Sequence, residues 1–301
     1  MTLRSIVTAL GGDLYCGGAR ANVPAPGHSE ADRSVSLLLS EGRVVIHGFG
    51  GTDWRTMRDD LLKRGFIDRS GKLACSGFAG ASISKPDRRQ RLETAARLWD
   101  DALPLREGST SDRYLRHRAV RSARSVLNLR HHPNAPTSVY RGGSRVRHGL
   151  IARISDTSDR LTAVELTYLD PNGRLASGLS LVRKTVGVVP PGAAVRLSAA
   201  GEEMLVGEGV VTTLSAVDRF GLPGWALMAA NNLAAWSPPP EVRRVLIAAD
   251  RGAVGQSAAL RLLRRLISRG VAAEAVWPNP PFGDWNDVEA DEAKRREKEG
   301  R

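Results

Sequence analysis

The chain of 301 residues contains only two cysteines, Cys16 and Cys75, which lie far apart in the sequence. They can form neither a disulfide framework nor a four-cysteine zinc site. Long hydrophobic runs are also absent, since no stretch reaches about 18 apolar residues. The first residues, MTLRSIVTALGGDLY, lack the charged start, apolar middle and cleavage site of a signal peptide. We therefore expect a cytoplasmic protein without membrane contact.

The sequence has no phosphate loop of the form G-x-x-x-x-G-K-[ST], which excludes an ATP-driven motor on this chain. Acidic residues are in deficit: 32 Asp and Glu stand against 44 Lys and Arg, giving a formal net charge of +12. This balance suits a polyanionic partner, because phosphate backbones bind through neutralisation and counterion release. Basic charge alone identifies nucleic-acid binders only weakly.

The order of apolar and polar segments predicts three folded parts and a tail. Residues 1–68 contain the alternating runs SVSLLL and RVVIHGF, which predict a small β-rich module. Residues 69–87 are rich in Gly and Ser and predict a linker. Residues 88–201 mix helical and strand patterns, which predicts an α+β domain. Strand runs alternate with helices over 202–290, which predicts an α/β domain with a parallel sheet, and 291–301 form a charged tail.

Four carboxylates fall in loops that follow predicted strands of the C-terminal domain. Glu208 stands in VGEG, Asp250 closes VLIAAD, and Asp284 and Asp287 stand in FGDWND. Functional groups gather beyond the C-terminal ends of parallel strands, so we expect these acids to face one cleft. Carboxylate oxygens suit Mg²⁺ or Mn²⁺, which points to chemistry on phosphate esters. Each acid alone could equally be a helix cap or a plain loop residue, but their joint occurrence favours a site.

At these residues the sequence resembles the Toprim domain, the catalytic fold shared by bacterial-type primases, topoisomerases and some nucleases. The resemblance rests on LVGEG, the following TTLSA, PPPEVRRVLIAAD and GDWNDV, over roughly residues 202–288. It implies a general acid or base at Glu208 and a metal-binding acid, also catalytic, at Asp250.

The second acid of the family's Asp-x-Asp pair is replaced, since the pair reads Asp250-Arg251-Gly252. Either Asp284 or Asp287 completes the metal site, or metal affinity is weak, or catalysis has been lost. Arg251 adds a positive charge that could bind phosphate and would also repel a metal.

The middle segment resembles the region that precedes Toprim in plasmid- and phage-type primases, through SDRYLRHRAV, LRHHP, ELTYLDPNGR and RKTVGVVPPGAAVRL. There, basic side chains line the template and nucleotide path, which implies this role for Lys184, Arg196 and Arg183. A solvated basic surface is an equally good interpretation for any one arginine.

The N-terminal stretch PAPGHSEADRSVSLLLSEGRVVIHGFGG resembles the zinc ribbon that opens these primases. His28 keeps one ligand position, but Ala25, Gly48 and Gly51 stand at the cysteine positions. One histidine cannot hold zinc, so we expect a degenerate ribbon without zinc. Its hairpin should be stabilised by apolar side chains, namely Val35, Leu37, Leu39, Val45, Ile46 and Phe49.

The sequence therefore predicts a DNA primase-like protein of a mobile element or its bacterial host. It would make short RNA primers from nucleoside triphosphates on single-stranded DNA by Mg²⁺-dependent nucleotidyl transfer. A helicase, if one is coupled to priming, would be a separate polypeptide. Two alternatives stay open. A non-catalytic DNA-binding replication accessory protein is favoured by Gly252 and the missing zinc ligands, and a Toprim nuclease would use the same acids to hydrolyse a phosphodiester.

Overall fold

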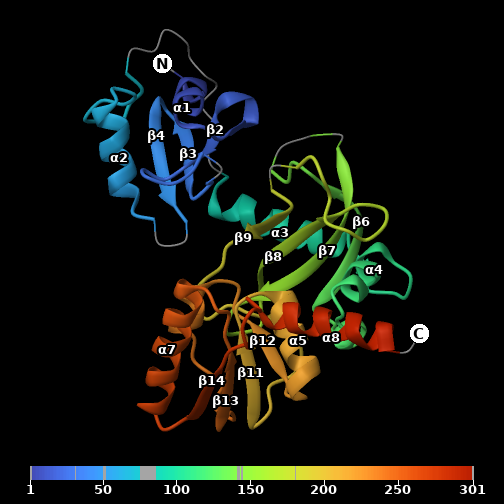
Figure 1. Cartoon of the computed structure of the whole chain (residues 1–301). Helices are drawn as coiled ribbons and strands as arrows, with labels where there is room; N and C mark the ends of the chain where they lie inside the picture. Colours follow the sequence, from blue (N-terminus) through green and yellow to red (C-terminus); the bar gives the residue numbers. More distant parts are fainter. Residues whose placement is uncertain are drawn as a thin grey trace. The chain divides into compact units, whose positions relative to one another are not determined.

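The chain divides into two units, Met1–Lys85 and Pro86–Arg301, in the computed structural model (Figure 1). The structure describes residues 2–30, 32–49, 52–74, 86–140, 143, 145–179 and 181–299. Gly51 and residues 75–85, which make up most of the predicted linker and include Cys75, lie outside the described residues. The expected β-rich N-terminal module, α+β central region and α/β C-terminal domain are confirmed.

The N-terminal unit is a four-stranded antiparallel sheet in the order β1-β2-β3-β4. Apolar residues at alternate positions of β3 turn one face of this sheet toward the core, where Leu3 of α1 and Leu61 of α2 are fully buried. The elements are α1 Leu3–Leu10, β1 Asp13–Tyr15, β2 Arg20–Val23, β3 Val35–Ser40, β4 Arg43–Gly48 and α2 Trp54–Lys63.

A two-residue turn sets the register between β3 and β4. Glu41 and Gly42 both have positive φ, at 51° and 76°, as in the hairpin turns whose twist matches that of the strands. Ser40 therefore pairs directly with Arg43. Because side chains alternate across a strand, this pairing decides which residues of β4 face the core.

The core face of β4 carries Val44 and Ile46, and the opposite face carries Val45. The expected hairpin core was wrong at two positions, since Val45 is 40% exposed and Phe49 is 47% exposed. The sequence run RVVI places two valines side by side, and only the position of the turn selects the buried one.

The loop between β2 and β3 is organised by the carboxylate of Asp32. This group accepts hydrogen bonds from the hydroxyl of Ser34 at 2.6 Å and from the N–H of Ala25 at 3.0 Å. It also lies 3.1 Å from Nδ1 of His28. The hydrogen bonds from Ser34 and Ala25 lower the pKa of Asp32 to about 2. A carboxylate thus holds the loop in which the resemblance places zinc ligands.

The central region is a five-stranded antiparallel sheet in the order β5-β6-β7-β8-β9. Helix α3 covers one face with Leu98 and Trp99, and α4 contributes Tyr114 and Leu115 to the core on the other face. The elements are α3 Arg88–Asp100, β5 Leu103–Pro104, α4 Thr110–His117, the 3₁₀-helix η2 Ser122–Ser125, β6 Leu129–Pro136, β7 Val146–Ser155, β8 Leu161–Leu169 and β9 Arg183–Gly187.

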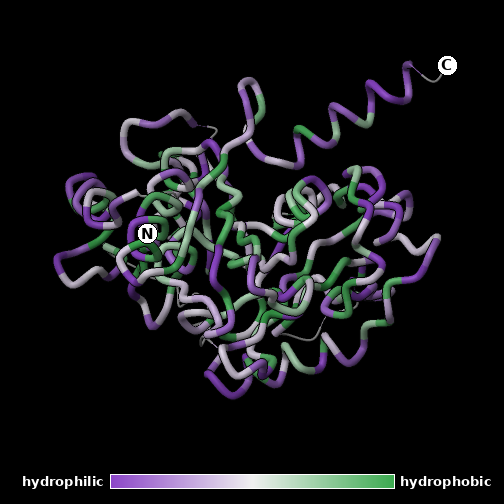
Figure 2. The backbone as a smooth tube through the Cα atoms, turned by 90° about the horizontal axis from the view of Figure 1, so that it is seen from below, coloured by the Kyte–Doolittle hydropathy of each residue, from purple (hydrophilic) through white to green (hydrophobic). Residues whose placement is uncertain are grey.

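The C-terminal domain is a five-stranded sheet in the order β10-β12-β11-β13-β14, parallel except for β10. Helices α5 and α8 pack on one face, and α6 and α7 pack on the other. Hydrophilic residues dominate the last turns of α8 toward the C-terminus (Figure 2). The elements are β10 Val195–Arg196, β11 Glu203–Gly207, α5 Val210–Phe220, β12 Gly224–Ala226, α6 Ala230–Ala235, β13 Arg244–Ala248, α7 Ala253–Ile267, β14 Ala272–Val276 and α8 Trp285–Glu299.

One hydrophobic core joins the central region to the C-terminal domain. Leu150 and Ile154 of β7 pack in the same cluster as Val210 and Leu214 of α5. The two sheets are therefore packed through buried apolar side chains rather than linked by an exposed segment. Among the described residues, no helix is both long and apolar enough to cross a bilayer.

Candidate active site

The site is built at the C-terminal edge of the parallel sheet. Strands β11 and β13 are neighbours, and their last residues, Gly207 and Ala248, are paired. Glu208 follows β11 directly, and Asp250 follows β13 by two residues. Both acids therefore leave the sheet at the same edge, because adjacent parallel strands end side by side.

Asp250 is the electrostatic centre of this edge. Burial first, and then the neighbouring carboxylates of Asp284, Glu208 and Asp287 in that order, together raise its pKa to about 7. Its Oδ1 is buried and has no hydrogen-bond partner among the described residues. A buried oxygen without a donor, next to other carboxylates, is costly unless a proton or a cation compensates it.

Glu208 and the acids at the start of α8 are held by backbone groups. Burial raises the pKa of Glu208, partly offset by a hydrogen bond from the N–H of Ala230. Asp284 Oδ1 accepts the N–H of Asp287 at 2.9 Å, and Asp287 Oδ2 accepts the N–H of Gly283 at 3.2 Å. The two aspartates thus cap the first turn of α8, and each keeps a second carboxylate oxygen for another partner.

These side chains offer the donors that Mg²⁺ or Mn²⁺ prefers, namely several carboxylate oxygens of which one is buried and unpartnered. Asp250, Asp284 and Asp287 would hold the ion. Among the described residues, no three His, Cys, Asp or Glu side chains are grouped closely enough to hold a metal. The chemical types of these donors suit the ion.

Gly252, where the Toprim pattern has an aspartate, leaves room for a side chain. A Cβ there would meet nothing within 4 Å, and its φ of −65° and ψ of 145° suit any residue. Gly252 is also the N-cap of α7, with no side chain to bond the exposed N–H groups. No steric reason keeps a carboxylate away from this position.

Arg251 joins the end of β13 to the loop before α8. Its Nε donates to the carbonyl of Pro278 at 2.5 Å, and its N–H donates to the carbonyl of Gly283 at 2.8 Å. We expected Arg251 to bind phosphate. One of its guanidinium N–H groups is instead hydrogen-bonded to the loop that leads to Asp284.

Arg183 and Lys184 lie on β9 of the central sheet. Lys184 Nζ donates to the carbonyl of Thr137 at 2.6 Å and lies 5.2 Å from the centre of the Tyr168 ring. Arg183 Nε donates to the hydroxyl of Thr167 at 3.3 Å. None of these contacts involves the four acids.

Arg196 lies on β10, three strands from β13, which corresponds to roughly 14 Å at ~4.8 Å per strand. Its guanidinium stacks over Trp225 at 4.7 Å and lies 3.3 Å from Asp159 Oδ1. It borders a cavity of about 870 Å³. The carboxylates of Asp284, Glu208 and Asp287 thus act on Asp250, whereas the contacts described for Arg196, Lys184 and Arg183 are with other residues.

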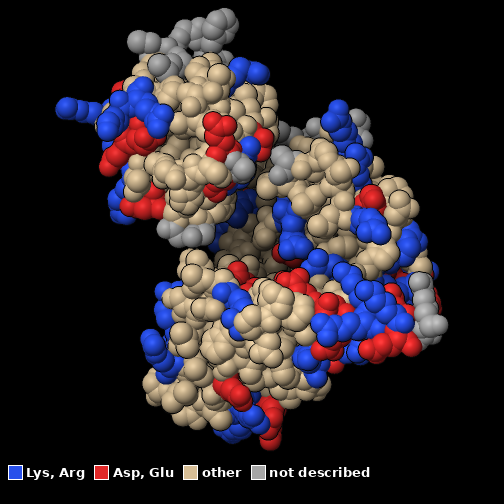
Figure 3. Space-filling model, in the orientation of Figure 1, with Lys and Arg blue, Asp and Glu red and all other residues tan. Residues whose placement is uncertain are grey.

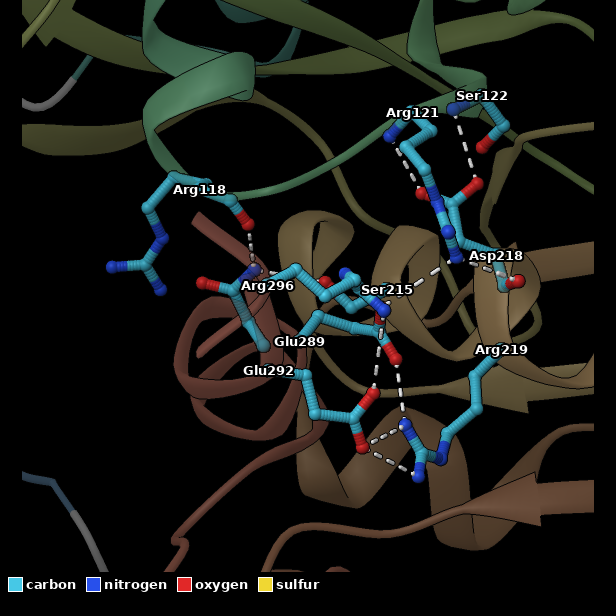
Figure 4. A network of polar contacts seen from close by, with 10 residues as sticks. Arg118, Arg121, Ser122, Ser215, Asp218, Arg219, Glu289, Glu292 and Arg296 are labelled. Carbon is cyan, nitrogen blue, oxygen red and sulfur yellow. Dashed lines mark hydrogen bonds and ion pairs between the residues drawn. The ribbon is translucent and has the colours of Figure 1, made fainter. Parts of the chain in front are cut away.

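A cluster of polar contacts that we did not expect connects α5, α8 and the segment after α4 (Figure 4). We call it the polar joint, and it consists of Arg118, Arg121, Ser122, Ser215, Asp218, Arg219, Asn286, Glu289 and Glu292. Asp218 of α5 accepts the N–H groups of Arg121 at 2.6 Å and Ser122 at 3.0 Å. Glu289 of α8 is 2% exposed and lies 2.8 Å from Arg219 and 3.6 Å from Arg121. These ion pairs fix the two helices that begin beside Glu208 and Asp284.

Asn286 is almost fully buried within the joint, at 1% exposure. Its Nδ2 donates to the carbonyl of Arg118 at 2.6 Å and to the hydroxyl of Ser215 at 2.8 Å. Asn286 stands between Trp285 and Asp287, so the amide fixes the first turn of α8. The sequence offers only a weak local signal, because the uncharged pair Trp285-Asn286 opens a segment otherwise rich in charge.

Two family models match the chain. One is the Toprim domain, over residues 203–294. Residues 203–294 form a Toprim domain. The other is a domain of unknown function (DUF7146), over residues 89–197. The expected Toprim domain is thereby confirmed, and the acids described above lie within it. No curated protein matches the chain.

Several solved primase structures are similar at low identity. The zinc-binding and RNA polymerase domains of the Aquifex aeolicus primase are 15% identical, with coverage of 98% of this chain and 82% of that one and a TM-score of 0.43. A DnaG primase catalytic domain bound to single-stranded DNA is 12% identical, with coverage of 70% and 77% and a TM-score of 0.48. The primase fragment of the bacteriophage T7 primase-helicase is 16% identical, with a TM-score of 0.37; the match covers 51% of this chain and 62% of that fragment.

Proposed function

We propose that the protein is a DNA primase-like enzyme that makes short RNA primers on single-stranded DNA by Mg²⁺-dependent nucleotidyl transfer. The observation that carries this proposal is Asp250: a half-buried carboxylate of the Toprim domain with a pKa of about 7, a buried oxygen without a partner and three acidic neighbours. Such a group is suited to a cation and to the phosphates that the cation accompanies.

In the proposed reaction, a nucleotide 3′-hydroxyl attacks the α-phosphorus of a nucleoside triphosphate. The new bond forms between that oxygen and phosphorus, and pyrophosphate leaves. Glu208, whose pKa is raised by burial, accepts the hydroxyl proton, because a carboxylate with a pKa nearer neutrality is a better general base. Asp250, Asp284 and Asp287 hold the metal, which when bound neutralises charge on the phosphates.

The template would meet a basic protein. The net charge of +12 favours a polyanion, of which single-stranded DNA is one. Lys and Arg side chains gather over α4 and α8, with Asp and Glu side chains among them (Figure 3). We assign Lys184, Arg183 and Arg196 to the template or nucleotide path by resemblance, and Arg251 to phosphate through its remaining guanidinium donors.

A binding role without catalysis is the second candidate, and Gly252 is the observation that favours it. With one carboxylate fewer than the family pattern, the site could hold metal too weakly for turnover. The protein would then act as a replication accessory that binds single-stranded DNA in the same architecture.

Incorporation of labelled nucleotides on single-stranded DNA, measured beside Mg²⁺ and Mn²⁺ binding by calorimetry, tests the proposal. We expect Glu208→Gln and Asp250→Asn to reduce incorporation by about 10²-fold or more, and Asp250→Asn to weaken metal binding. Glu202→Gln, an exposed acid of the same domain, is the matched control and should change neither quantity.

Three results would overturn the primase proposal. Metal-dependent DNA cleavage without incorporation would identify a Toprim nuclease. Salt-sensitive DNA binding with neither metal binding nor product would identify the accessory role. Incorporation that survives in Asp250→Asn would place the chemistry elsewhere.

A further inference from the structure

A groove of about 670 Å³ follows strand β4 of the N-terminal unit. One wall is β4 itself, with Val45 and Ile46. The other walls are the start of α2, with Trp54 and Arg58, and the turn at residues 67–71. We call this the β4 groove. Val45 is 40% exposed and Trp54 is 43% exposed, so the groove offers apolar side chains to solvent.

The β4 groove runs along an open strand edge. β4 is the last strand of its sheet, and the N–H of Phe49 donates to the carbonyl of Ser34, the residue before β3. Hydrogen-bonded and non-bonded pairs alternate in an antiparallel ladder, so the N–H and C=O of Ile46 point away from β3. Among the described residues, no backbone or side-chain group pairs with this outward N–H.

The chain already adds a strand-like segment to the first half of this edge. The N–H of Val44 donates to Gly71 at 2.8 Å, and Arg43 forms an antiparallel bridge with Lys72. The edge therefore has the twist and access that strand pairing requires. Beyond Val44 it is left open beside Trp54.

The charge of the β4 groove is positive. Its lining includes Arg43, Arg58 and Arg69 against the single acid Glu41. Backbone carbonyls orient two of these guanidinium groups, since Arg43 Nε donates to Ser70 and Arg58 Nη2 donates to Arg69. Their other N–H groups stay available to an anionic partner.

We propose that the β4 groove binds an extended acidic segment of a partner protein, which adds to β4 at Ile46 as a further strand. A peptide supplies both an acceptor for the Ile46 N–H and a donor for its C=O, whereas nucleic-acid phosphates only accept. A second copy of this chain would bring the same arginines and be repelled. Acidic side chains pair with the arginines, and the intervening apolar side chains rest on Val45 and Trp54.

The test uses the full chain and a labelled decapeptide in which Glu alternates with Val. We expect binding at least tenfold tighter than that of the matching Lys and Val peptide, measured by fluorescence anisotropy. Arg58→Glu with Arg69→Glu should abolish it. Lys63→Glu, an exposed charge of α2 outside the groove, should leave it unchanged.

Hydrogen exchange of the Ile46 amide gives a second readout in the unmutated protein. Strand addition should slow this exchange at least tenfold when the acidic peptide is bound. Equal binding of the Glu and Lys peptides, or an Ile46 amide that exchanges at the same rate with and without peptide, would overturn the proposal. Competition by a ten-nucleotide oligo-dT without Ile46 protection would assign the groove to single-stranded nucleic acid instead.

Discussion

At the scale of single residues, Asp250 combines burial with three acidic neighbours, and this combination makes the site sensitive to pH. Its pKa is about 7 in the folded protein against 3.8 for an ordinary aspartate. The folded state therefore binds a proton that the unfolded state has lost between these pH values. Stability conferred by that proton declines as pH rises from about 4 to 7, and at pH 8 the full cost of the buried charge is present.

Replacing this charge should stabilise the metal-free protein under alkaline conditions. We expect Asp250→Asn to raise the Tm at pH 8 in the presence of a chelator, and to change it much less at pH 4, where Asp250 is already neutral. Thermal unfolding followed at both pH values measures the difference. An equal gain at the two values would show that the charge of Asp250 is not the cause.

Gly252 allows a direct repair of the missing carboxylate. Gly252→Asp should increase Mg²⁺ affinity by about tenfold, because it adds a donor with no steric obstacle at the N-cap of α7. Gly252→Asn is the control, since it caps the helix equally well without the charge. Calorimetric titration of both variants separates the two effects, and equal affinities would refute a metal role for this position.

At the scale of elements, α5 and α8 each begin beside a carboxylate of the site, and both are anchored further along by the polar joint. Asn286 and Glu289 hold α8 against α5 and the segment after α4. Movement of this segment would therefore displace the first turn of α8, which contains Asp287 and follows directly after Asp284. The joint therefore holds in place the helix that begins at the proposed metal site.

Removal of the buried side-chain amide of Asn286 should show whether the joint holds the proposed metal site in place. Asn286→Ala leaves the carbonyl of Arg118 without its donor and should cost about 1–3 kcal/mol of unfolding free energy, together with weaker Mg²⁺ binding. Glu292→Ala removes a half-exposed partner of Arg219 and should cost less than about 1 kcal/mol. Denaturant unfolding and metal titration of the two variants test the contrast; similar losses would mean that burial is unimportant here.

The sequence predicted the elements whose signals are local. The apolar run VLIAAD stops at Asp250, and VGEG stops at Glu208, so the strand ends were visible without a structure. The joint was not visible, because Asn286 contacts residues 71 and 168 positions away. Which of Val44 and Val45 is buried depended on a single turn. The places of Lys184 and Arg196 depended on strand order, which periodicity does not encode.

At the scale of the whole molecule, the hydrophobic clusters separate along the two units. One cluster lies within the N-terminal unit, and the others lie within Pro86–Arg301. Each unit therefore has its own hydrophobic core, which is the condition for folding independently of the other unit. The proposed metal site lies wholly within the second unit, and the β4 groove lies within the first.

Calorimetric unfolding of the full chain should accordingly show two transitions. Asp32→Ala should lower only the transition of the N-terminal unit, because Asp32 holds the loop between β2 and β3. The depressed pKa of Asp32 contributes stability above about pH 4 that is lost as pH falls through 2, so the effect should shrink at pH 2. Asp59→Ala, an exposed acid of the same unit, is the control, and a single transition shifted as a whole would contradict the prediction.

Both bonds from Arg251 end on backbone carbonyl groups, those of Pro278 and Gly283. Every amino acid has such a carbonyl. The residues of the loop from Pro278 to Gly283 can therefore be substituted during evolution without loss of these two hydrogen bonds. An insertion or deletion would break the spacing, whereas substitutions would not. Related chains with an arginine at this position should therefore share the length of this loop more closely than its residues.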